Sequence, residues 1–310
     1  MNAPVFIVGA LRSGTSLLRL MLDHHPQVCI FGEFEYAVRW VHDDSPPPLA
    51  AYSRNLRLDR VFRAQGFEID SSLDYSQLVE SFLDQASRAT GKPICGGTVH
   101  SNFHYLKRFW PDARYVHLIR DPRDVARSCI GMGWVGNVFY GTRYWLEPAL
   151  RWKHLEPTLA DDQKHQLKFE DLIQDPVGEL TKICNFLGIA YDESMLQYPT
   201  DTTYSLPDPS LTEQWRRKLS DEEIMWVESA CHPLMTELGY LPHHSSIRPP
   251  STFRAAALGL QHRFSRLKRN VRVYGLPLYA SWQFAKRMPH GRLQERILRK
   301  VDDVNSNRLK

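Results

Sequence analysis

The stretch PVFIVGALRSGTSLL, residues 4–18, constrains the fold of this chain more than any other segment. A hydrophobic run leads through two glycines into an apolar periodic segment that begins with hydroxyl residues. This order predicts a strand at residues 5–8, a loop, and a helix at about residues 13–24. A second hydrophobic run, at residues 28–31, ends before Gly32 and Glu33. The chain therefore opens as a βαβ unit, which favours an α/β fold with a parallel sheet.

The loop in this stretch suits an anion, because a turn entering a helix offers free N–H groups and the positive end of the helix dipole. Its glycines match the spacing G-x-x-x-x-G, but Thr15 stands where loops for nucleoside triphosphates carry lysine. We expect a smaller anion, held without metal; an ordinary helix-capping turn is the alternative. The residues that can contact the anion are Arg12, Ser13, Gly14, Thr15 and Ser16.

A second candidate anion site follows the hydrophobic run at residues 114–119. Arg120 comes directly after that run, and Ser128 lies eight residues on, on the same face of a helix expected to start near Pro122. The carboxyl ends of inner strands are where open α/β sheets bind ligands, so two such sites indicate one ligand with two separated anionic groups. The alternative is that Arg120 pairs with a carboxylate, namely Asp121, Asp124 or Glu170.

Composition bounds the class of protein. The chain has 310 residues, 43% of them hydrophobic and 24% charged, as in an ordinary soluble globular protein. It contains no apolar run of membrane-spanning length and no leader-like start, which predicts a cytoplasmic location. The five cysteines are widely spaced and form no C-x-x-C pair, and the 13 histidines show no metal-ligand spacing. We therefore expect buried thiols and no metal.

Charge divides the chain near residue 245. Residues 246–310 carry 15 lysines and arginines against three acidic residues, whereas the first 245 residues carry 24 against 32. We predict a catalytic domain at residues 1–245 and a basic, helical extension at residues 246–310. The extension is a candidate for contact with a membrane surface, which would make the protein membrane-peripheral, or for self-association; nucleic acid is not expected.

Two smaller expectations concern local structure. Residues 43–60, with three consecutive prolines, are expected to form an irregular surface insertion. The sequence SDEE at residues 220–223 is a capping box, which predicts one helix running to about residue 238.

Four blocks of this sequence resemble the sulfotransferase superfamily in order and spacing: FIVGALRSGTSLL, GE at residues 32–33, FWPDARYVHLIRDPRDVARS and KFEDLIQDPVGELTKICNFLGI. The resemblance covers about residues 4–190 and has features of both the cytosolic and the tyrosylprotein enzymes. It implies a P-loop-like, three-layer fold with a central parallel β-sheet flanked by helices. It also implies 3'-phosphoadenosine 5'-phosphosulfate as the sulfuryl donor, with no metal. That donor has a single phosphate bearing a sulfonate, which accounts for the missing lysine.

The donor-binding residues carried over from the family fall into three groups. The 5'-phosphosulfate is implied to lie on Arg12, Ser13, Gly14, Thr15 and Ser16, the 3'-phosphate on Arg120 and Ser128, and a late donor contact on Thr203 or Ser205. Many members place a lysine for the leaving oxygen just after a central strand, but this chain has Thr98 or a glycine there. Arg12 is then the best substitute.

The general base has two candidates. His100 matches the position used by cytosolic enzymes, and Glu33 matches the position used by tyrosylprotein enzymes. An ordinary histidine pKa of about 6.5 suits a base near neutral pH better than about 4.3 for glutamate, which slightly favours His100. The alternatives are that Glu33 pairs with an arginine and that His100 is a polar strand end. The aromatic residues Trp134, Tyr140 and Trp145 could line an acceptor pocket or belong to the core.

The sequence thus favours an enzyme that transfers a sulfuryl group to an acceptor hydroxyl of unidentified class. Two other hypotheses stay open at this stage. One is a nucleotide kinase or other P-loop-type enzyme of nucleoside triphosphates. The other is a non-catalytic nucleotide-binding adaptor whose basic tail docks to a membrane or a partner.

Overall fold

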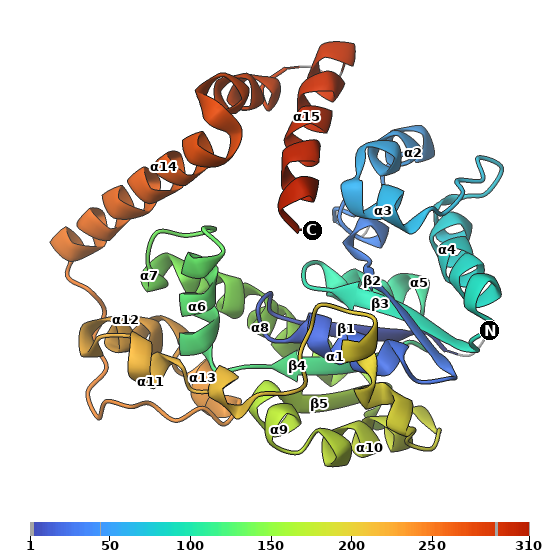
Figure 1. The fold of residues 1–310 in the computed structure, drawn as a ribbon, viewed down its shortest axis with the longest axis horizontal. Coiled ribbons are helices and arrows are strands. Elements are labelled where there is room, and N and C mark those ends of the chain that lie inside the picture. Colours follow the sequence, from blue (N-terminus) through green and yellow to red (C-terminus); the bar gives the residue numbers. More distant parts are fainter. Residues whose placement is uncertain (1–2, 44, 289–290, 310) are drawn as a thin grey trace.

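A five-stranded parallel sheet forms the centre of the molecule (Figure 1). The computed structural model describes residues 3–43, 45–288 and 291–309. The strand order is β2-β3-β1-β4-β5. All pairs are parallel, so the carboxyl ends of the strands share one edge. The strands are β1 (Val5–Gly9), β2 (Val28–Glu33), β3 (Ile94–Val99), β4 (Arg114–Ile119) and β5 (Lys164–Lys168).

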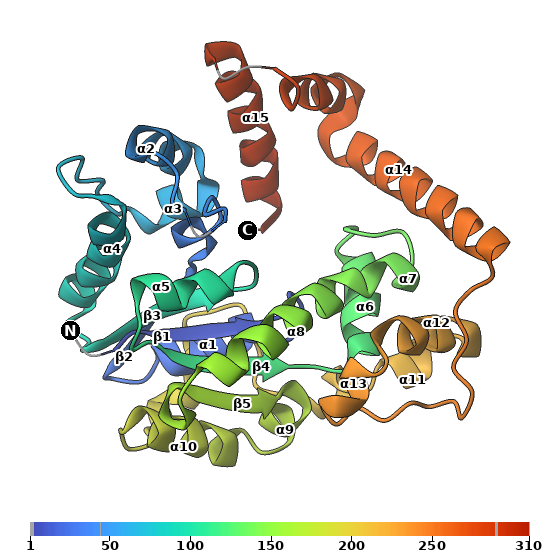
Figure 2. The ribbon, with the colours of Figure 1, turned by 180° about the vertical axis from the view of Figure 1, so that it is seen from behind.

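Helices cover both faces of the sheet, which gives the predicted three layers. Alternate side chains of β1 enter different cores: Phe6 and Val8 join one cluster, Val5 and Ile7 the other. The first cluster lies under α4 (Tyr75–Thr90), α5 (Leu106–Phe109) and α8 (Arg143–Leu155), and Figure 2 shows α8 crossing this face. The second lies under α1 (Thr15–Asp23), α9 (Phe169–Gln174) and α10 (Pro176–Leu187).

A third apolar cluster lies beyond the carboxyl ends of the strands. Its helices are α6 (Pro122–Gly131), α7 (Val138–Gly141), α12 (Asp221–Cys231) and α13 (Leu234–Glu237), with the short α11 (Trp215–Lys218) beside them. Arg123 joins these elements: its guanidinium pairs with Asp121 and Glu228, each at 2.7 Å, and lies 3.7 Å from the Trp215 ring centre. These partners compensate a charge that is almost fully buried, so removing one would leave an uncompensated charge.

Two local predictions are wrong. Residues 43–60 are not irregular throughout, because α2 (Leu49–Leu58) forms there and is followed by α3 (Arg60–Gln65). The side chains of Tyr52 and Leu56, four residues apart, are fully buried, and this face holds α2 on the body. The helix that starts after Ser220 ends at Cys231 rather than near residue 238, because Pro233 interrupts it before α13.

The C-terminal arm, residues 252–309, consists of α14 (Thr252–Ala285) and α15 (Arg292–Leu309). Gly275, with φ of 71°, breaks the helical path of α14, and in Figures 1 and 2 the arm rises from the side of α12 and returns toward α3. The helical extension is therefore confirmed, while the domain boundary near residue 245 stays a prediction. Within the described residues, every helix is too short or too polar to cross a bilayer.

The arm is attached to the body at both of its helices. Leu258 is buried in the third cluster, and its carbonyl accepts a hydrogen bond from Asn137 at 2.9 Å. His262 stacks on Tyr140 with ring centres 4.2 Å apart. At the other end, Asp302 of α15 lies 3.6 Å from Arg63 of α3.

Candidate active site

The loop between β1 and α1 has an unusual backbone. Gly14 precedes α1 with φ of 94°, and a Cβ built on it would lie 2.2 Å from a ring carbon of Phe169. This position therefore requires glycine. Arg12 also has a left-handed backbone, with φ of 71°, which costs energy for a residue with a side chain. Such strain concentrates at functional sites, so the loop is a candidate for one.

A cavity of about 490 Å³, here called the loop cavity, lies beside this loop. It brings together residues that are far apart in the sequence: Arg12, Gly14, Thr15, Ser16, Arg120, Ser128, Thr203 and Ser205 all line it. These include both candidate anion sites and the candidate late donor contacts. Ser13 differs, because it is fully buried and its hydroxyl has no hydrogen-bond partner among the described residues.

Arg120 is fixed at the end of β4 by several contacts. Its guanidinium donates to the carbonyl oxygens of Arg12 at 3.1 Å and Leu211 at 2.6 Å, and it lies 4.3 Å from the Phe169 ring centre. Its nearest carboxylate is Asp124 at 3.7 Å, a partner foreseen as an alternative. Burial lowers the pKa of Arg120 and raises that of Asp124. Because the buried Arg120 Nε has no partner among the described residues, this N–H can serve a ligand.

The two candidate anion sites touch each other. Arg12 Nε donates a hydrogen bond to Ser128 Oγ at 3.0 Å, which joins the loop to α6. Arg127 also lines the loop cavity and donates to Gln214 at 3.2 Å. We did not predict Arg127; its place directly before Ser128 was the available signal. Three arginines therefore surround a cavity suited to a ligand with more than one negative charge.

A second cavity of about 390 Å³, here called the His100 cavity, lies at the ends of β2 and β3. His100 and Glu33 both line it, as do Leu11, Glu35, Trp134 and Tyr144. His100 Nδ1 lies 3.0 Å from the carbonyl oxygen of Gly9. A carbonyl only accepts hydrogen bonds, so Nδ1 carries a proton, and in the neutral form of the ring Nε2 is the nitrogen without one. This is the form of histidine that can act as a base.

Glu35 was missed by the sequence analysis. Its side chain is buried, and its Oε1 accepts a hydrogen bond from the backbone N–H of His100 at 2.6 Å. Burial raises the pKa of this carboxyl group, and Oε2 has no partner among the described residues. A glutamate two residues after Glu33 was the available signal, but its burial beside His100 depends on how β2 and β3 pair.

The ion pairs considered as the alternative role of Glu33 do not occur among the described residues. Arg39 pairs instead with Asp59 at 2.5 Å, and Arg12 donates to Ser128. Glu33 is exposed at the rim of the His100 cavity. Both base candidates therefore lie at the same cavity, one buried and one exposed.

The three aromatic candidates have different places. Trp134 lines the His100 cavity with its ring centre 5.4 Å from that of Tyr144. Trp145 is buried in the core, where its indole N–H donates to the carbonyl of Arg120 at 2.8 Å. Tyr140 packs on the arm. Thr98, which stands where a lysine was expected, is buried in β3.

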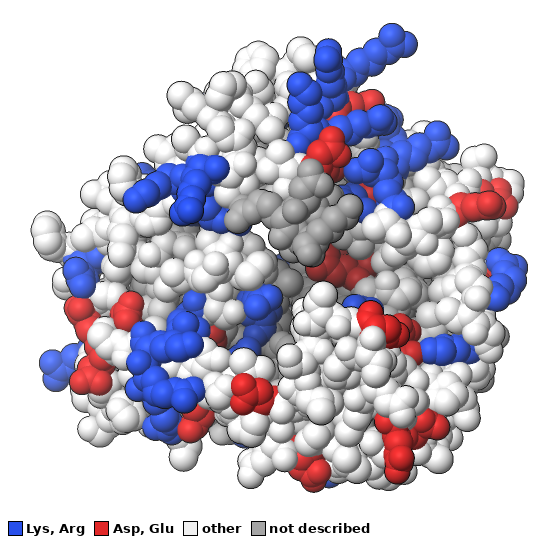
Figure 3. Space-filling model, viewed as in Figure 1, with Lys and Arg blue, Asp and Glu red and all other residues white. Residues whose placement is uncertain are grey.

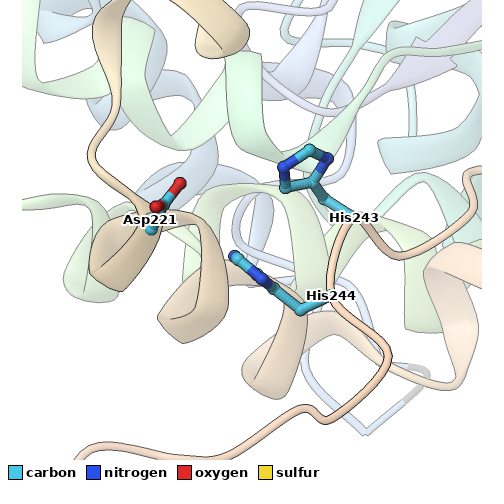
Figure 4. Close-up of side chains that lie close together, drawn as sticks. All are labelled: Asp221, His243 and His244. Carbon is cyan, nitrogen blue, oxygen red and sulfur yellow. The ribbon is translucent and has the colours of Figure 1, made fainter.

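One group among the described residues has the donor types and closeness of a metal site. The ligand atoms of Asp221, His243 and His244 lie within 4.8 Å of one another (Figure 4). Nitrogen and oxygen donors of this kind suit Zn²⁺. These residues line neither cavity, and the backbone N–H groups of both histidines donate to Glu228, at 2.7 Å and 3.3 Å. The two hydrogen bonds to Glu228 fasten the segment after α13 to α12.

Comparison with known proteins assigns the family. The model of the sulfotransferase family matches residues 4–193, so this chain belongs to the sulfotransferase family. Protein-tyrosine sulfotransferase A of Caenorhabditis elegans is 25% identical over 260 residues, covering 77% of this chain and 67% of that protein. The predicted family and enzyme class are confirmed, and the nucleotide kinase alternative is not favoured.

Solved structures support the fold. The sulfotransferase domain from the curacin biosynthetic pathway has a TM-score of 0.56 at 16% identity, covering 78% of this chain and 99% of that domain. The sulfotransferase domain of the Synechococcus PCC 7002 olefin synthase has a TM-score of 0.53 at 23% identity, covering 74% and 95%. The shared part leaves about a quarter of this chain unmatched in each case.

Proposed function

We propose that this protein transfers a sulfuryl group from 3'-phosphoadenosine 5'-phosphosulfate, bound in the loop cavity, to an acceptor hydroxyl bound in the His100 cavity. One observation carries the proposal: the consecutive residues Leu11 and Arg12 line the two different cavities. A group held at this loop would therefore lie between a donor on one side and an acceptor on the other. In-line displacement needs this arrangement.

The loop cavity fits a donor with two anionic ends. The free N–H groups at the start of α1 and the hydroxyls of Thr15 and Ser16 would hold the 5'-phosphosulfate. Arg120, whose buried Nε lacks a partner among the described residues, and Ser128 would hold the 3'-phosphate. Each hydrogen bond to a charged group of this kind contributes roughly 1.5 to 3 kcal/mol. Thr203 and Ser205 would close the remaining side of the cavity.

The His100 cavity supplies acid–base chemistry. His100 Nε2 accepts the proton of the acceptor hydroxyl as the acceptor oxygen forms its bond to sulfur. The bond between sulfur and the bridging oxygen breaks, and the electron pair stays on the leaving phosphate. Arg12 stabilises this developing charge, which is the role left open by the replacement of lysine at Thr98. The products are a sulfate ester and adenosine 3',5'-bisphosphate.

For the acceptor, we propose a phenolic or sugar hydroxyl that stacks on an aromatic surface. Trp134 and Tyr144 offer such a surface beside His100. This chain is similar to protein-tyrosine sulfotransferase A of Caenorhabditis elegans. A tyrosine-containing peptide is therefore the first acceptor to test.

The decisive experiment measures the binding of adenosine 3',5'-bisphosphate and of adenosine 5'-phosphate to the purified protein. We expect the bisphosphate to bind at least about 100-fold more tightly, because its 3'-phosphate makes two charge-assisted hydrogen bonds that adenosine 5'-phosphate cannot make. Equal affinity for the two nucleotides would overturn the proposal. Labelled donor should then transfer label to a tyrosine peptide or to a carbohydrate, and the acceptor that takes up the label identifies the class.

A further inference from the structure

The C-terminal arm exposes an unusual share of the apolar surface of this protein. Fourteen large hydrophobic side chains are exposed among the described residues, and seven of them lie between Phe253 and Leu293. The three exposed phenylalanines in this set, at positions 253, 264 and 284, are all in the arm and are 85%, 69% and 64% exposed. A soluble surface of this size normally carries such side chains singly rather than concentrated on one element.

Four of the six large exposed hydrophobic side chains of α14, those before the break at Gly275, form one continuous stripe. Their spacing is seven, four and three residues, so at about 100° per residue they share one face of the helix. The opposite face carries Leu258 and His262, which pack on the body. The stripe therefore points away from the body, and it is called the outer stripe here. Its members are Phe253, Leu260, Phe264 and Leu267.

The charges around the outer stripe have a single sign. Arg263 and Lys268 flank it on its two sides, and both are exposed. The sequence contains no aspartate or glutamate between Leu238 and Gln294. No ion pair of the described residues involves Arg263, Arg266, Lys268, Arg269 or Arg272; the one ion pair of α14 is that of Arg254 with Glu222 at 3.0 Å. These cations are therefore free to face a negatively charged surface.

Three of these cations line a hollow on the side of α14 that faces the body. A cavity of about 760 Å³ lies between α14 and residues 130–136, and Lys268, Arg269 and Arg272 line it. Gly133 allows this close approach, since a Cβ there would lie 2.1 Å from the Arg269 side chain. Figure 3 shows Lys and Arg gathered over α15 and beside α14, while most Asp and Glu lie over the lower part of the molecule.

We propose that α14 lies on the surface of a membrane that contains anionic lipids. The outer stripe enters the boundary between headgroups and acyl chains, and the flanking cations contact lipid phosphates. A second copy of the chain fits less well: four side chains offer on the order of 400 Å², about half of what each partner contributes to a stable dimer. A protein surface would also have to match an entirely cationic helix. This attachment does not depend on the sulfuryl transfer proposed above.

The test uses the full chain and sedimentation with vesicles of phosphatidylcholine, with and without phosphatidylserine. We expect binding to the mixed vesicles and at least about tenfold weaker binding to phosphatidylcholine alone, with loss of binding at high salt. Equal binding to both kinds of vesicle, or none to either, would overturn the proposal.

Matched variants locate the surface. Phe264→Ser with Leu267→Ser should weaken binding to the mixed vesicles by at least about tenfold. Arg263→Gln with Lys268→Gln should weaken it by about 30-fold, since each cation near an anionic surface contributes about fivefold. The control is Leu150→Ser with Val177→Ser, which removes exposed apolar side chains from the body and should leave binding unchanged.

Two measurements on the same variants distinguish a lost membrane contact from misfolding and from a lost dimer. Binding of adenosine 3',5'-bisphosphate to each variant reports whether the body is intact, because none of the changed residues lines the loop cavity. If Phe264→Ser with Leu267→Ser leaves vesicle binding unchanged, α14 is not the membrane contact. If it instead abolishes a concentration-dependent dimer, the outer stripe binds a second copy and the proposal is wrong.

Discussion

The loop cavity and the His100 cavity share one loop, but their side chains are held in different ways. In the loop cavity, Arg120 is fixed by two backbone carbonyls and an aromatic ring, and Arg12 is bound to Ser128. In the His100 cavity, Glu33 is exposed and one oxygen of Glu35 lacks a partner among the described residues. Each cavity keeps a polar atom for a ligand, Arg120 Nε in the first and Glu35 Oε2 in the second, but the arginines of the first are held by several contacts whereas Glu33 of the second is exposed.

This difference matches the separate tasks proposed for the two cavities. A donor of constant structure is best bound by a rigid set of charges, since less ordering is needed on binding. Proteins that share a fold act on different acceptors. The acceptor cavity is therefore formed by segments whose sequence varies more from one protein to another. Variants in the loop cavity should therefore change donor affinity, whereas variants in the His100 cavity should change turnover or acceptor affinity.

The largest effect is expected from His100. His100→Asn keeps an N–H that can reach the Gly9 carbonyl but removes Nε2, so turnover should fall by about 10²- to 10⁴-fold. Affinity for adenosine 3',5'-bisphosphate should stay within about twofold, because His100 does not line the loop cavity. Single-turnover kinetics and equilibrium binding separate the two quantities. If Glu33→Gln abolishes turnover and His100→Asn does not, the base is Glu33.

Arg120→Ala should have the next largest effect, on the other cavity. Affinity for adenosine 3',5'-bisphosphate should fall by about 100-fold, or about 3 kcal/mol, because a buried charge-assisted contact is lost. Adenosine 5'-phosphate, which lacks the 3'-phosphate, serves as the control ligand in calorimetry. An equal loss of affinity for both nucleotides would mean that Arg120 does not contact the 3'-phosphate and affects binding only through its hydrogen bond to the Arg12 carbonyl.

A smaller effect concerns the sheet that supports both cavities. His117 in β4 is buried against Trp152, which lowers its pKa to about 4, while an unfolded histidine titrates near about 6.5. Between these values the unfolded chain binds the extra proton, so stability is lost as pH falls. From about pH 7.5 to about pH 5 this group should cost about 2 kcal/mol of unfolding free energy. Urea unfolding of His117→Gln should lack this increment, and an unchanged pH dependence would contradict the assignment.

The smallest effect should come from Trp134. Trp134→Leu should raise the KM of an aromatic or sugar acceptor about fivefold, or about 1 kcal/mol, through loss of a stacking surface. Donor affinity should not change. Tyr140→Leu is the matched control, because Tyr140 stacks on His262 of the arm. Equal changes in KM for the two variants would remove Trp134 from the acceptor site.

The loop cavity could be predicted from sequence because its parts are local. Residues 12–16 are contiguous, and Arg120 and Ser128 lie at a fixed helical spacing after a strand. All but Ser13 of these residues line the cavity. Ser13 is the exception because the direction of a side chain within a tight loop depends on the backbone angles of its neighbours.

The His100 cavity could be predicted only in part. Its base candidates were found because they end strands, but Glu35 and the contact of Trp134 with Tyr144 depend on tertiary packing. The same reason applies to α2. The three prolines before it suggested irregular structure, and the face of α2 that is buried depends on its packing against the body. The roles of the site residues and the cytoplasmic location stay predictions.

The contact between Asp302 and Arg63 has a consequence for the order of assembly. Asp302 lies in α15 and Arg63 in α3, so the contact closes only after the chain has been synthesised beyond residue 302. The sheet and its two cavities consist of residues that emerge from the ribosome much earlier. The sheet can therefore form during translation, whereas the arm docks after it, so that attachment to a membrane through α14 would follow the folding of the body.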